Sequence, residues 1–262
     1  MRIKAGDVYL NYELTGKEGT PVVMLSHSLG LSLAMWAPQL AVLESRYRVL
    51  CYDMRGHGAS DASEGAYTLE QLADDALGLL NALGIDRIHF VGLSIGGMIA
   101  QAIALNHADR LRSLVLCDTS AYLPPANLPL VQERIKTARR QGLPALVDST
   151  LERWFTPAYL KQNPPPVGRV RYQFLATSVA GYIGCSEAIG KLNFLEQLSK
   201  ITLPTLIMVG AEDPGTPVAA SEAIHERIKG SKLVILPSAS HLSNIEQADQ
   251  FNSHLQEFLK AH

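Results

Sequence analysis

The stretch Gly92-Leu93-Ser94-Ile95-Gly96-Gly97 places a serine at a sharp turn between an apolar strand and a helix. The strand is predicted over 88–91 and the helix over 97–104, and both consist mainly of apolar or small residues, which is typical of buried layers. Gly92 and Gly96 allow the strand and the helix to approach closely around a strained serine. The G-x-S-x-G pattern also occurs in ordinary glycine-rich turns, but this strand-to-helix setting favours a nucleophile elbow, with free N–H groups of the helix start beside the serine.

Further apolar runs of strand length lie on both sides of this turn. The predicted strands cover residues 8–12, 21–26, 47–52, 88–91, 111–117, 203–210 and 233–237. A helix is predicted over 69–83, because Thr68 and Gln71 have the spacing of a capping box and leucines then repeat at helical spacing. Strands that alternate with helices predict an α/β fold, with a mostly parallel sheet and helices on both of its faces.

The segment 122–200 has a different pattern. It lacks strand patterns, and its helical patterns are rich in Arg and Gln and are interrupted by prolines at 124–125 and 164–166. We therefore expect residues 1–121 and 201–262 to form the core, with 122–200 inserted as a helical lid over the carboxyl edge of the sheet.

Composition excludes several classes of protein. A chain of 262 residues with 47% hydrophobic content can bury one large core. The net charge is −2 and long runs of Lys or Arg are absent, so the sequence gives no case for binding nucleic acid or an anionic membrane surface. No apolar run is long enough to span a bilayer, and residues 1–6 lack the apolar segment of a signal peptide, so we expect a cytoplasmic protein.

The three cysteines do not form a recognisable framework. Cys51, Cys117 and Cys185 are widely separated, and their spacing matches no metal site. Buried reduced thiols are therefore expected. The sequence contains no metal-ligand cluster and no nucleotide-binding glycine fingerprint, so no cofactor and no metal are expected.

A serine is a weak nucleophile at neutral pH, so the elbow predicts a histidine base and a carboxylate that orients it. Of the eight histidines, His241 lies in a polar loop directly after the last predicted strand. Asp213 follows the predicted strand over 203–210 and gives the chain order Ser, Asp, His that is expected of α/β hydrolases. Ser94, Asp213 and His241 are therefore the predicted catalytic residues.

Two other carboxylates compete with Asp213. Glu212 is adjacent but is expected to point the other way in an extended turn, and Asp118 also follows a strand from which it could reach the same histidine. His27 and His57 each lie in a glycine-flanked loop, and we interpret both as structural. Stabilising the oxyanion needs backbone donors, which we assign to the N–H groups of Ile95 and Leu29.

These features resemble the α/β-hydrolase fold family and, more narrowly, the 3-oxoadipate enol-lactonases, which open β-ketoadipate enol-lactone in aromatic catabolism. The resemblance implies an α/β-hydrolase fold, a mostly parallel sheet of about eight strands with helices on both faces and a helical lid. The matching stretches are 26–30 with 35–36, 52–60, 92–98, 153–156 and 210–213. The elbow, the Arg-Gly-His-Gly loop and the terminal acid and histidine are shared by many esterases and C–C hydrolases. His-Ser-Leu-Gly at 27–30 and Trp-Phe-Thr at 154–156 carry the narrower match.

The resemblance implies a small lactone or ester substrate with a carboxylate, which needs a cation or several N–H donors in an apolar pocket. The segment 122–200 contains more basic than acidic residues, and most of these cations are expected to be solvated. Trp154 and Phe155 are expected to form an aromatic wall, with Arg153 as the candidate for the carboxylate. The natural substrate and the oligomeric state stay open.

Three classes of function are consistent with these residues. The first is a serine hydrolase that forms an acyl-enzyme, either an enol-lactonase or a general carboxylesterase or C–C hydrolase. The second is a cofactor-free lyase or oxygenase in which Ser94 and His241 only move a proton. The third is a ligand receptor that keeps the three residues but reports binding. Covalent trapping of Ser94 distinguishes the first class from the others.

Overall fold

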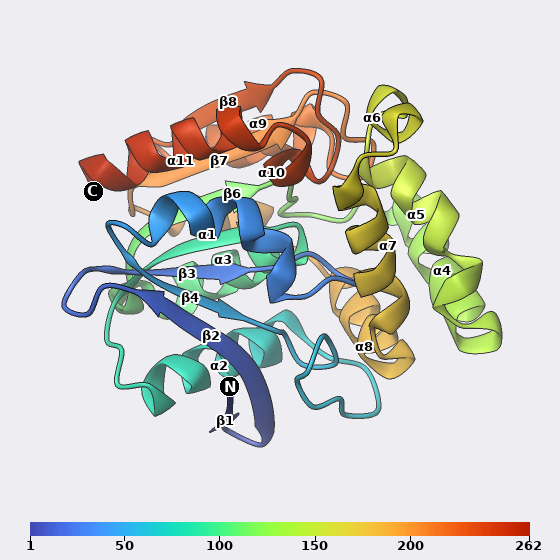
Figure 1. Ribbon diagram of the computed structural model, residues 1–262, viewed down its shortest axis with the longest axis horizontal. Helices are drawn as coiled ribbons and strands as arrows, with labels where there is room; N and C mark the ends of the chain where they lie inside the picture. The colour runs from blue at the N-terminus through green and yellow to red at the C-terminus, as the bar shows by residue number, and fades with distance from the viewer.

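The computed structural model describes residues 1–262 and contains one eight-stranded sheet (Figure 1). Its strands are β1 (Arg2–Ala5), β2 (Val8–Gly16), β3 (Val22–Ser26), β4 (Arg48–Tyr52), β5 (Ile88–Leu93), β6 (Leu111–Cys117), β7 (Thr205–Gly210) and β8 (Lys232–Leu236). Their order is β1-β2-β4-β3-β5-β6-β7-β8. β2 is antiparallel to both neighbours, β1 and β4, and all other pairs are parallel. The predicted α/β fold with a mostly parallel sheet is confirmed.

The inner strands are apolar on both faces because both faces are covered. Successive side chains of a strand point to opposite faces, so Met24 of β3 joins one hydrophobic cluster while its neighbours Val23 and Leu25 join the other. The first cluster includes residues of α2 and α3, and the second includes residues of α1 and α11. This explains why the sequence showed continuous apolar runs at these strands in place of alternation.

The helices of the core lie in two layers, one on each face of the sheet (Figure 1). They are α1 (Ala37–Leu43), α2 (Leu69–Ala82), α3 (Ile95–Asn106), α9 (Val218–Arg227), α10 (Ser243–Glu246) and α11 (Ala248–Ala261). Thr68 caps α2 as predicted, since its Oγ1 accepts a hydrogen bond from Gln71 N at 3.0 Å. Gln71 does not return the bond, so only half of the predicted capping box forms. The three cysteines are buried free thiols, as predicted.

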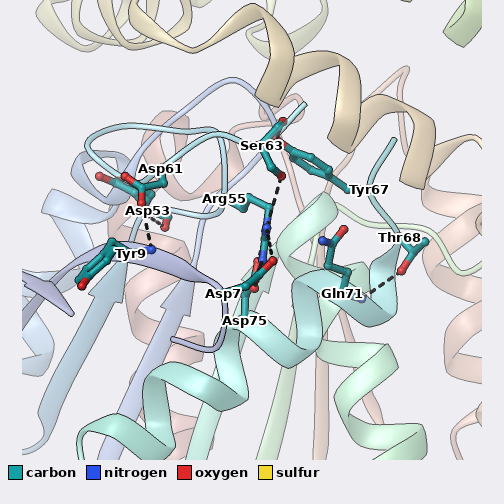
Figure 2. A network of polar contacts seen from close by, with 11 residues as sticks. Asp7, Tyr9, Asp53, Arg55, Asp61, Ser63, Tyr67, Thr68, Gln71 and Asp75 are labelled. Atoms are coloured by element: carbon teal, nitrogen blue, oxygen red, sulfur yellow. Dashed lines mark hydrogen bonds and ion pairs between the residues drawn. The ribbon is translucent and has the colours of Figure 1, made fainter. Parts of the chain in front are cut away.

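A buried arginine fixes the loop that follows β4 (Figure 2). Arg55 donates from Nε to Asp75 of α2 at 2.8 Å and from Nη2 to Asp7 of the β1–β2 turn at 2.5 Å. Nη1 donates to Ser63 Oγ at 3.3 Å. The Arg55 side chain is only 3% exposed, so a partner removed from this network would leave a desolvated charge. The network ties the loop to both α2 and the start of the sheet.

The segment between β6 and β7 consists mainly of helices and contains none of the eight strands. It contains α4 (Leu128–Gln141), α5 (Val147–Trp154), α6 (Pro157–Gln162), α7 (Pro165–Ala176) and α8 (Val179–Ile189), followed by a 3₁₀ helix over Leu195–Lys200. Figure 1 shows α4 to α8 gathered beside the end of the sheet at which the parallel strands finish. Pro164 and Pro165 mark the boundary between α6 and α7, because proline is well tolerated in a first helical turn. None of the helices in the chain combines the length and the apolar character that crossing a membrane requires.

Candidate active site

Ser94 lies between β5 and α3 with φ of 58° and ψ of −120°, a conformation that residues other than glycine rarely adopt. The turn can be this tight because its glycines lack Cβ. A Cβ on Gly92 would lie 2.2 Å from the Gly96 carbonyl oxygen, and a Cβ on Gly96 would lie 2.2 Å from the Ser26 carbonyl oxygen. Thr119 Oγ1 donates to the Ser94 carbonyl at 2.7 Å. The strained serine is therefore fixed by its surroundings.

His241 and Asp213 form a buried pair on the loops after β8 and β7. His241 Nδ1 lies 2.7 Å from Asp213 Oδ2. Thr216 Oγ1 donates to the same carboxylate oxygen at 2.5 Å, and Gly215 N donates to Asp213 Oδ1 at 2.7 Å. Burial alone would raise the pKa of Asp213, but the His241 charge and the hydrogen bonds from His241 and Thr216 outweigh it and lower that pKa. The carboxylate is therefore kept ionised beside the imidazole.

Ser94 and His241 line one cavity with a volume of about 270 Å³. The Ser94 hydroxyl makes no hydrogen bond in the structure, and it opens onto this cavity. Hydrogen bonds between the side chains of an active site are often long or absent without a ligand and form when a substrate binds.

Asp118, the alternative acid, does not contact His241. It follows β6 with a φ of 43°, and its two oxygens accept hydrogen bonds from Gly210 N at 2.8 Å and from Ser243 Oγ at 2.5 Å. Burial, followed by the Asp213 charge, raises the pKa of Asp118 well above its ordinary value. Its position therefore suits it to join β7 to α10 and not to orient the histidine. Glu212, the other alternative, is exposed.

The two buried histidines near the elbow bind backbone groups. Gly30 N donates to His57 Nε2 at 2.9 Å, and Met54 N donates to His27 Nε2 at 2.9 Å. Burial, followed by the charge of His27, lowers the pKa of His57 to about 3, so its imidazole stays neutral and can accept this bond. These contacts fix the 27–30 loop next to the elbow.

The two predicted oxyanion donors are available. Leu29 N donates no hydrogen bond. The neighbouring backbone groups do bond, since Gly30 N donates to His57 Nε2 and Ser28 O accepts from Leu31 N at 3.2 Å. Ile95 is the first residue of α3, so its N–H has no partner within the helix. Leu29 also lines the cavity beside Ser94. Both N–H groups thus remain free for a ligand oxygen.

The aromatic wall differs in part from the prediction. Trp154 lines the cavity and stacks on His241, with ring centroids 6.3 Å apart and an angle of 21° between the planes. Phe155 points away and stacks on Tyr159, so its predicted place in the wall is wrong. Adjacent residues at the end of a helix project in different directions, which is why only one of the pair reaches the cavity. Phe174 of α7 lies edge-on to Trp154 at 5.6 Å and takes that place.

Of the ten basic residues in segment 122–200, two line the cavity. Arg153 was the predicted candidate, and Arg134 of α4 was not singled out. A helical stripe marks Arg134, because Asn127, Leu130 and Val131 precede it at seven, four and three residues and all line the cavity. Thr216 was also missed, since a threonine three residues after an acid has no distinctive pattern. No group of three or more His, Cys, Asp or Glu side chains is placed to hold a metal ion.

Comparisons with known proteins give a consistent result. Residues 21–248 match the α/β-hydrolase fold family. The chain is 36% identical over 258 residues to 3-oxoadipate enol-lactonase 2 of Acinetobacter baylyi, covering 98% of this chain and 96% of that protein. It is 30% identical to a RutD protein of Stutzerimonas stutzeri, named as a carbamate hydrolase, covering 95% and 96% of the two chains. The crystal structure of the enol-lactonase from Burkholderia xenovorans LB400 superposes with a TM-score of 0.96 at 39% identity, covering 99% of this chain and 100% of that chain.

Proposed function

The chain belongs to the α/β-hydrolase fold family, and from this premise we propose that it is a serine hydrolase that opens 3-oxoadipate enol-lactone to 3-oxoadipate. The observation that carries the proposal is a single cavity that contains Ser94, His241 and the free N–H of Leu29, with Asp213 bonded to the far side of the imidazole. The relatives named as enol-lactonases supply the substrate.

In the proposed first step, Ser94 Oγ attacks the lactone carbonyl carbon while His241 Nε2 takes the hydroxyl proton. Asp213 accepts the Nδ1–H of His241, which fixes the tautomer that leaves Nε2 free for this proton and stabilises the imidazolium. The carbonyl oxygen becomes an oxyanion, and the N–H groups of Leu29 and Ile95 stabilise its charge. The strained elbow keeps these donors and the nucleophile on one side of the carbonyl.

Collapse of this intermediate breaks the ring C–O bond and forms the acyl-enzyme. The leaving group is an enolate oxygen that stays attached to the acyl chain, and His241 returns the proton to it. The enol then tautomerises to the ketone of 3-oxoadipate. A water molecule, deprotonated by His241, attacks the acyl carbon and releases the second carboxylate and Ser94.

In this proposal residues 1–121 and 201–262 supply the chemistry, and the helical segment 122–200 acts as a lid that shapes the cavity and excludes water. Trp154 supports this role, because it contacts both the cavity and the His241 ring. An apolar wall with few polar groups is the usual form of a small-molecule site.

The proposal is tested by kcat/KM values for 3-oxoadipate enol-lactone, a simple lactone, a short-chain ester and a small carbamate, measured without added metal. We expect the enol-lactone to have the highest value by at least about ten-fold, and Ser94→Ala to remove turnover of all four. A higher kcat/KM for the carbamate would contradict the enol-lactonase proposal and favour carbamate hydrolysis, the activity after which the RutD relative is named.

A further inference from the structure

Arg134 of α4 and Arg153 of α5 line the cavity that contains Ser94, and neither has an ionic partner. Two other cations of the helical segment do. Lys136 of α4 lies 3.5 Å from Glu133, and Arg171 of α7 lies 2.6 Å from Asp148. The two guanidinium groups that face the cavity are half-buried without an ion pair, whereas the other arginines of the segment that lack an ion pair are exposed.

The cavity wall contains no acidic side chain. Its 23 lining residues include two arginines and one histidine but no Asp, Glu or Lys. Asp213 lies nearby, behind Gly215, but its oxygens already accept hydrogen bonds from Gly215, Thr216 and His241. Like charges in a partly buried cavity repel each other strongly unless an anion neutralises them.

Arg134 is oriented by neutral groups from two other helices. Its Nη2 donates to Thr150 Oγ1 of α5 at 2.5 Å, and its Nε donates to Tyr182 Oη of α8 at 3.2 Å. Thr150 and Tyr182 are both buried and also line the cavity. A guanidinium has five N–H donors, so these two contacts fix its plane and leave donors on Nη1 and Nη2 for a ligand.

Arg153 lines the same cavity. Its side chain makes no hydrogen bond, and its Nη2 would lie 3.2 Å from a Cβ on Gly215, next to Asp213. Burial, followed by the charge of Arg134, lowers the pKa of Arg153, so the field of one arginine reaches the other. A ligand anion between them would relieve this repulsion.

We propose that Arg134 and Arg153 together bind the free carboxylate of the substrate, with Arg134 as the residue that determines the preference for an acid over a neutral lactone. Planar guanidinium groups match a carboxylate with two parallel N–H···O bonds. The ligand class is a small lactone with one carboxylate, which corresponds to the substrate in the proposed function, on which this inference rests. Arg134 is the residue to test because Arg153 lies close to Gly215, whose N–H binds Asp213, so a change at Arg153 would also affect the catalytic pair.

The test compares kcat/KM for the enol-lactone acid and its methyl ester in wild type, Arg134→Gln, Arg134→Lys and Arg140→Gln. Arg140 is the matched control, since it lies on the same helix, is exposed and forms no ion pair. We expect wild type to favour the acid by about ten- to a hundred-fold, because a desolvated cation without its partner is costly. Arg134→Gln should lose most of that preference through a raised KM for the acid, with the ester within about two-fold of wild type.

Arg134→Lys should retain part of the preference, because an ammonium keeps the charge but loses the two parallel bonds. Arg140→Gln should behave as wild type. Equal losses for the acid and the ester in Arg134→Gln would assign Arg134 a purely structural role and overturn the inference. A wild type that does not distinguish the two substrates would also overturn it.

A binding measurement separates this inference from the proposed function. Calorimetric titration of adipate into Ser94→Ala and into Ser94→Ala/Arg134→Gln needs no chemistry. We expect adipate to bind the first at least about ten-fold more tightly. Equal affinity contradicts the carboxylate site even if Ser94 is the nucleophile. Ester turnover that survives Ser94→Ala contradicts the proposed function even if adipate binding depends on Arg134.

Discussion

The carboxyl edge of the sheet and the helical segment 122–200 both form walls of the cavity, but they position their polar groups differently. At the edge, Ser94 directly follows β5 and its carbonyl accepts a hydrogen bond from Thr119, while Asp213 lies on the loop after β7 and accepts one from Gly215 N. In the helical segment, Arg134 extends from a helix and is oriented only by two hydroxyl groups, and Arg153 has no side-chain hydrogen bond. Short connections to a rigid sheet suit chemistry that needs fixed distances. Long side chains on packed helices suit recognition, in which the contacts can differ between relatives.

The two regions are joined next to the histidine. Leu242 N donates to the Trp154 carbonyl at 3.0 Å, and Ser240 Oγ donates to the Arg153 carbonyl at 3.0 Å. Glu246 accepts from Thr156 N at 3.1 Å, which adds a contact from α10. Residues 153–156 are therefore tied to the carboxyl edge of the sheet, whereas α4 with Arg134 makes no hydrogen bond to the His241 loop. We therefore expect substitutions at the carboxyl edge to lower activity more than substitutions in the helical segment.

The largest loss of activity should come from substitutions at the carboxyl edge of the sheet. Ser94→Ala is expected to lower kcat by roughly 10⁴-fold or more, because the nucleophile is lost while the turn keeps its shape. His241→Ala should cost a similar amount, and the double variant should lose no more than either single one, because the two side chains act as a unit. Steady-state kinetics of all three variants checks this. Additive losses would mean that the two residues act separately.

The second effect distinguishes two buried acids of the same edge. Asp213→Asn should lower kcat by roughly 10³- to 10⁴-fold, because an amide cannot fix the imidazole tautomer or stabilise the imidazolium. Asp118→Asn should leave kcat within about ten-fold, because its carboxylate contacts Gly210 and Ser243 and not His241. Circular dichroism of both variants verifies folding. The reverse order of losses would assign the catalytic acid to the loop after β6.

Acid should destabilise the core more than the helical segment, which contains no histidine. The pKa of His57 is about 3 in the folded protein against 6.5 when unfolded, because burial disfavours the charged ring. Between pH 7 and 5 the unfolded state therefore gains a proton that the folded state does not, and stability falls by about 2 kcal/mol.

The control for this prediction is His57→Gln, whose amide oxygen can accept the Gly30 N–H but does not titrate. Asp118 has a raised pKa in the folded protein, so it adds stability as the pH falls, but it contributes equally in wild type and in the variant. Urea unfolding at pH 7 and 5 should show a stability loss about 2 kcal/mol smaller in the variant than in wild type. An equal loss in both would exclude His57 as the source.

The smallest effect on activity should come from Trp154 in the cavity wall. Trp154→Ala removes the ring that stacks on His241 and contacts Phe174, so KM should rise by roughly ten-fold. A smaller fall in kcat should follow where the ring also excludes water from the acyl-enzyme. Trp154→Phe should keep most of the apolar contact and serves as the comparison. A change in kcat alone, with KM unaffected, would show that the ring positions His241 and does not bind substrate.

The same division explains what the sequence could predict. Buried parallel strands show as apolar runs, so their ends, and the residues Ser94 and His241 after them, could be located without a structure. The sequence favoured Asp213 as the acid but kept Asp118 as a competitor, because both follow strands. The structure separates them through the hydrogen bonds that Thr216 and His241 make to Asp213. In the helical segment, the side that faces the cavity depends on how five helices pack. Phe155 was therefore misplaced, and Arg134 was not separated from its solvated neighbours.

Covalent trapping at Ser94 tests the central claim most directly. The purified protein is treated with an organophosphonate, and activity, intact mass and the modified peptide are followed together in wild type and Ser94→Ala. We predict one phosphonyl group per chain, located on Ser94, added in step with the loss of activity and absent from the variant. An active protein that stays unlabelled, or a label on another residue in the inactivated protein, would contradict Ser94 as the nucleophile.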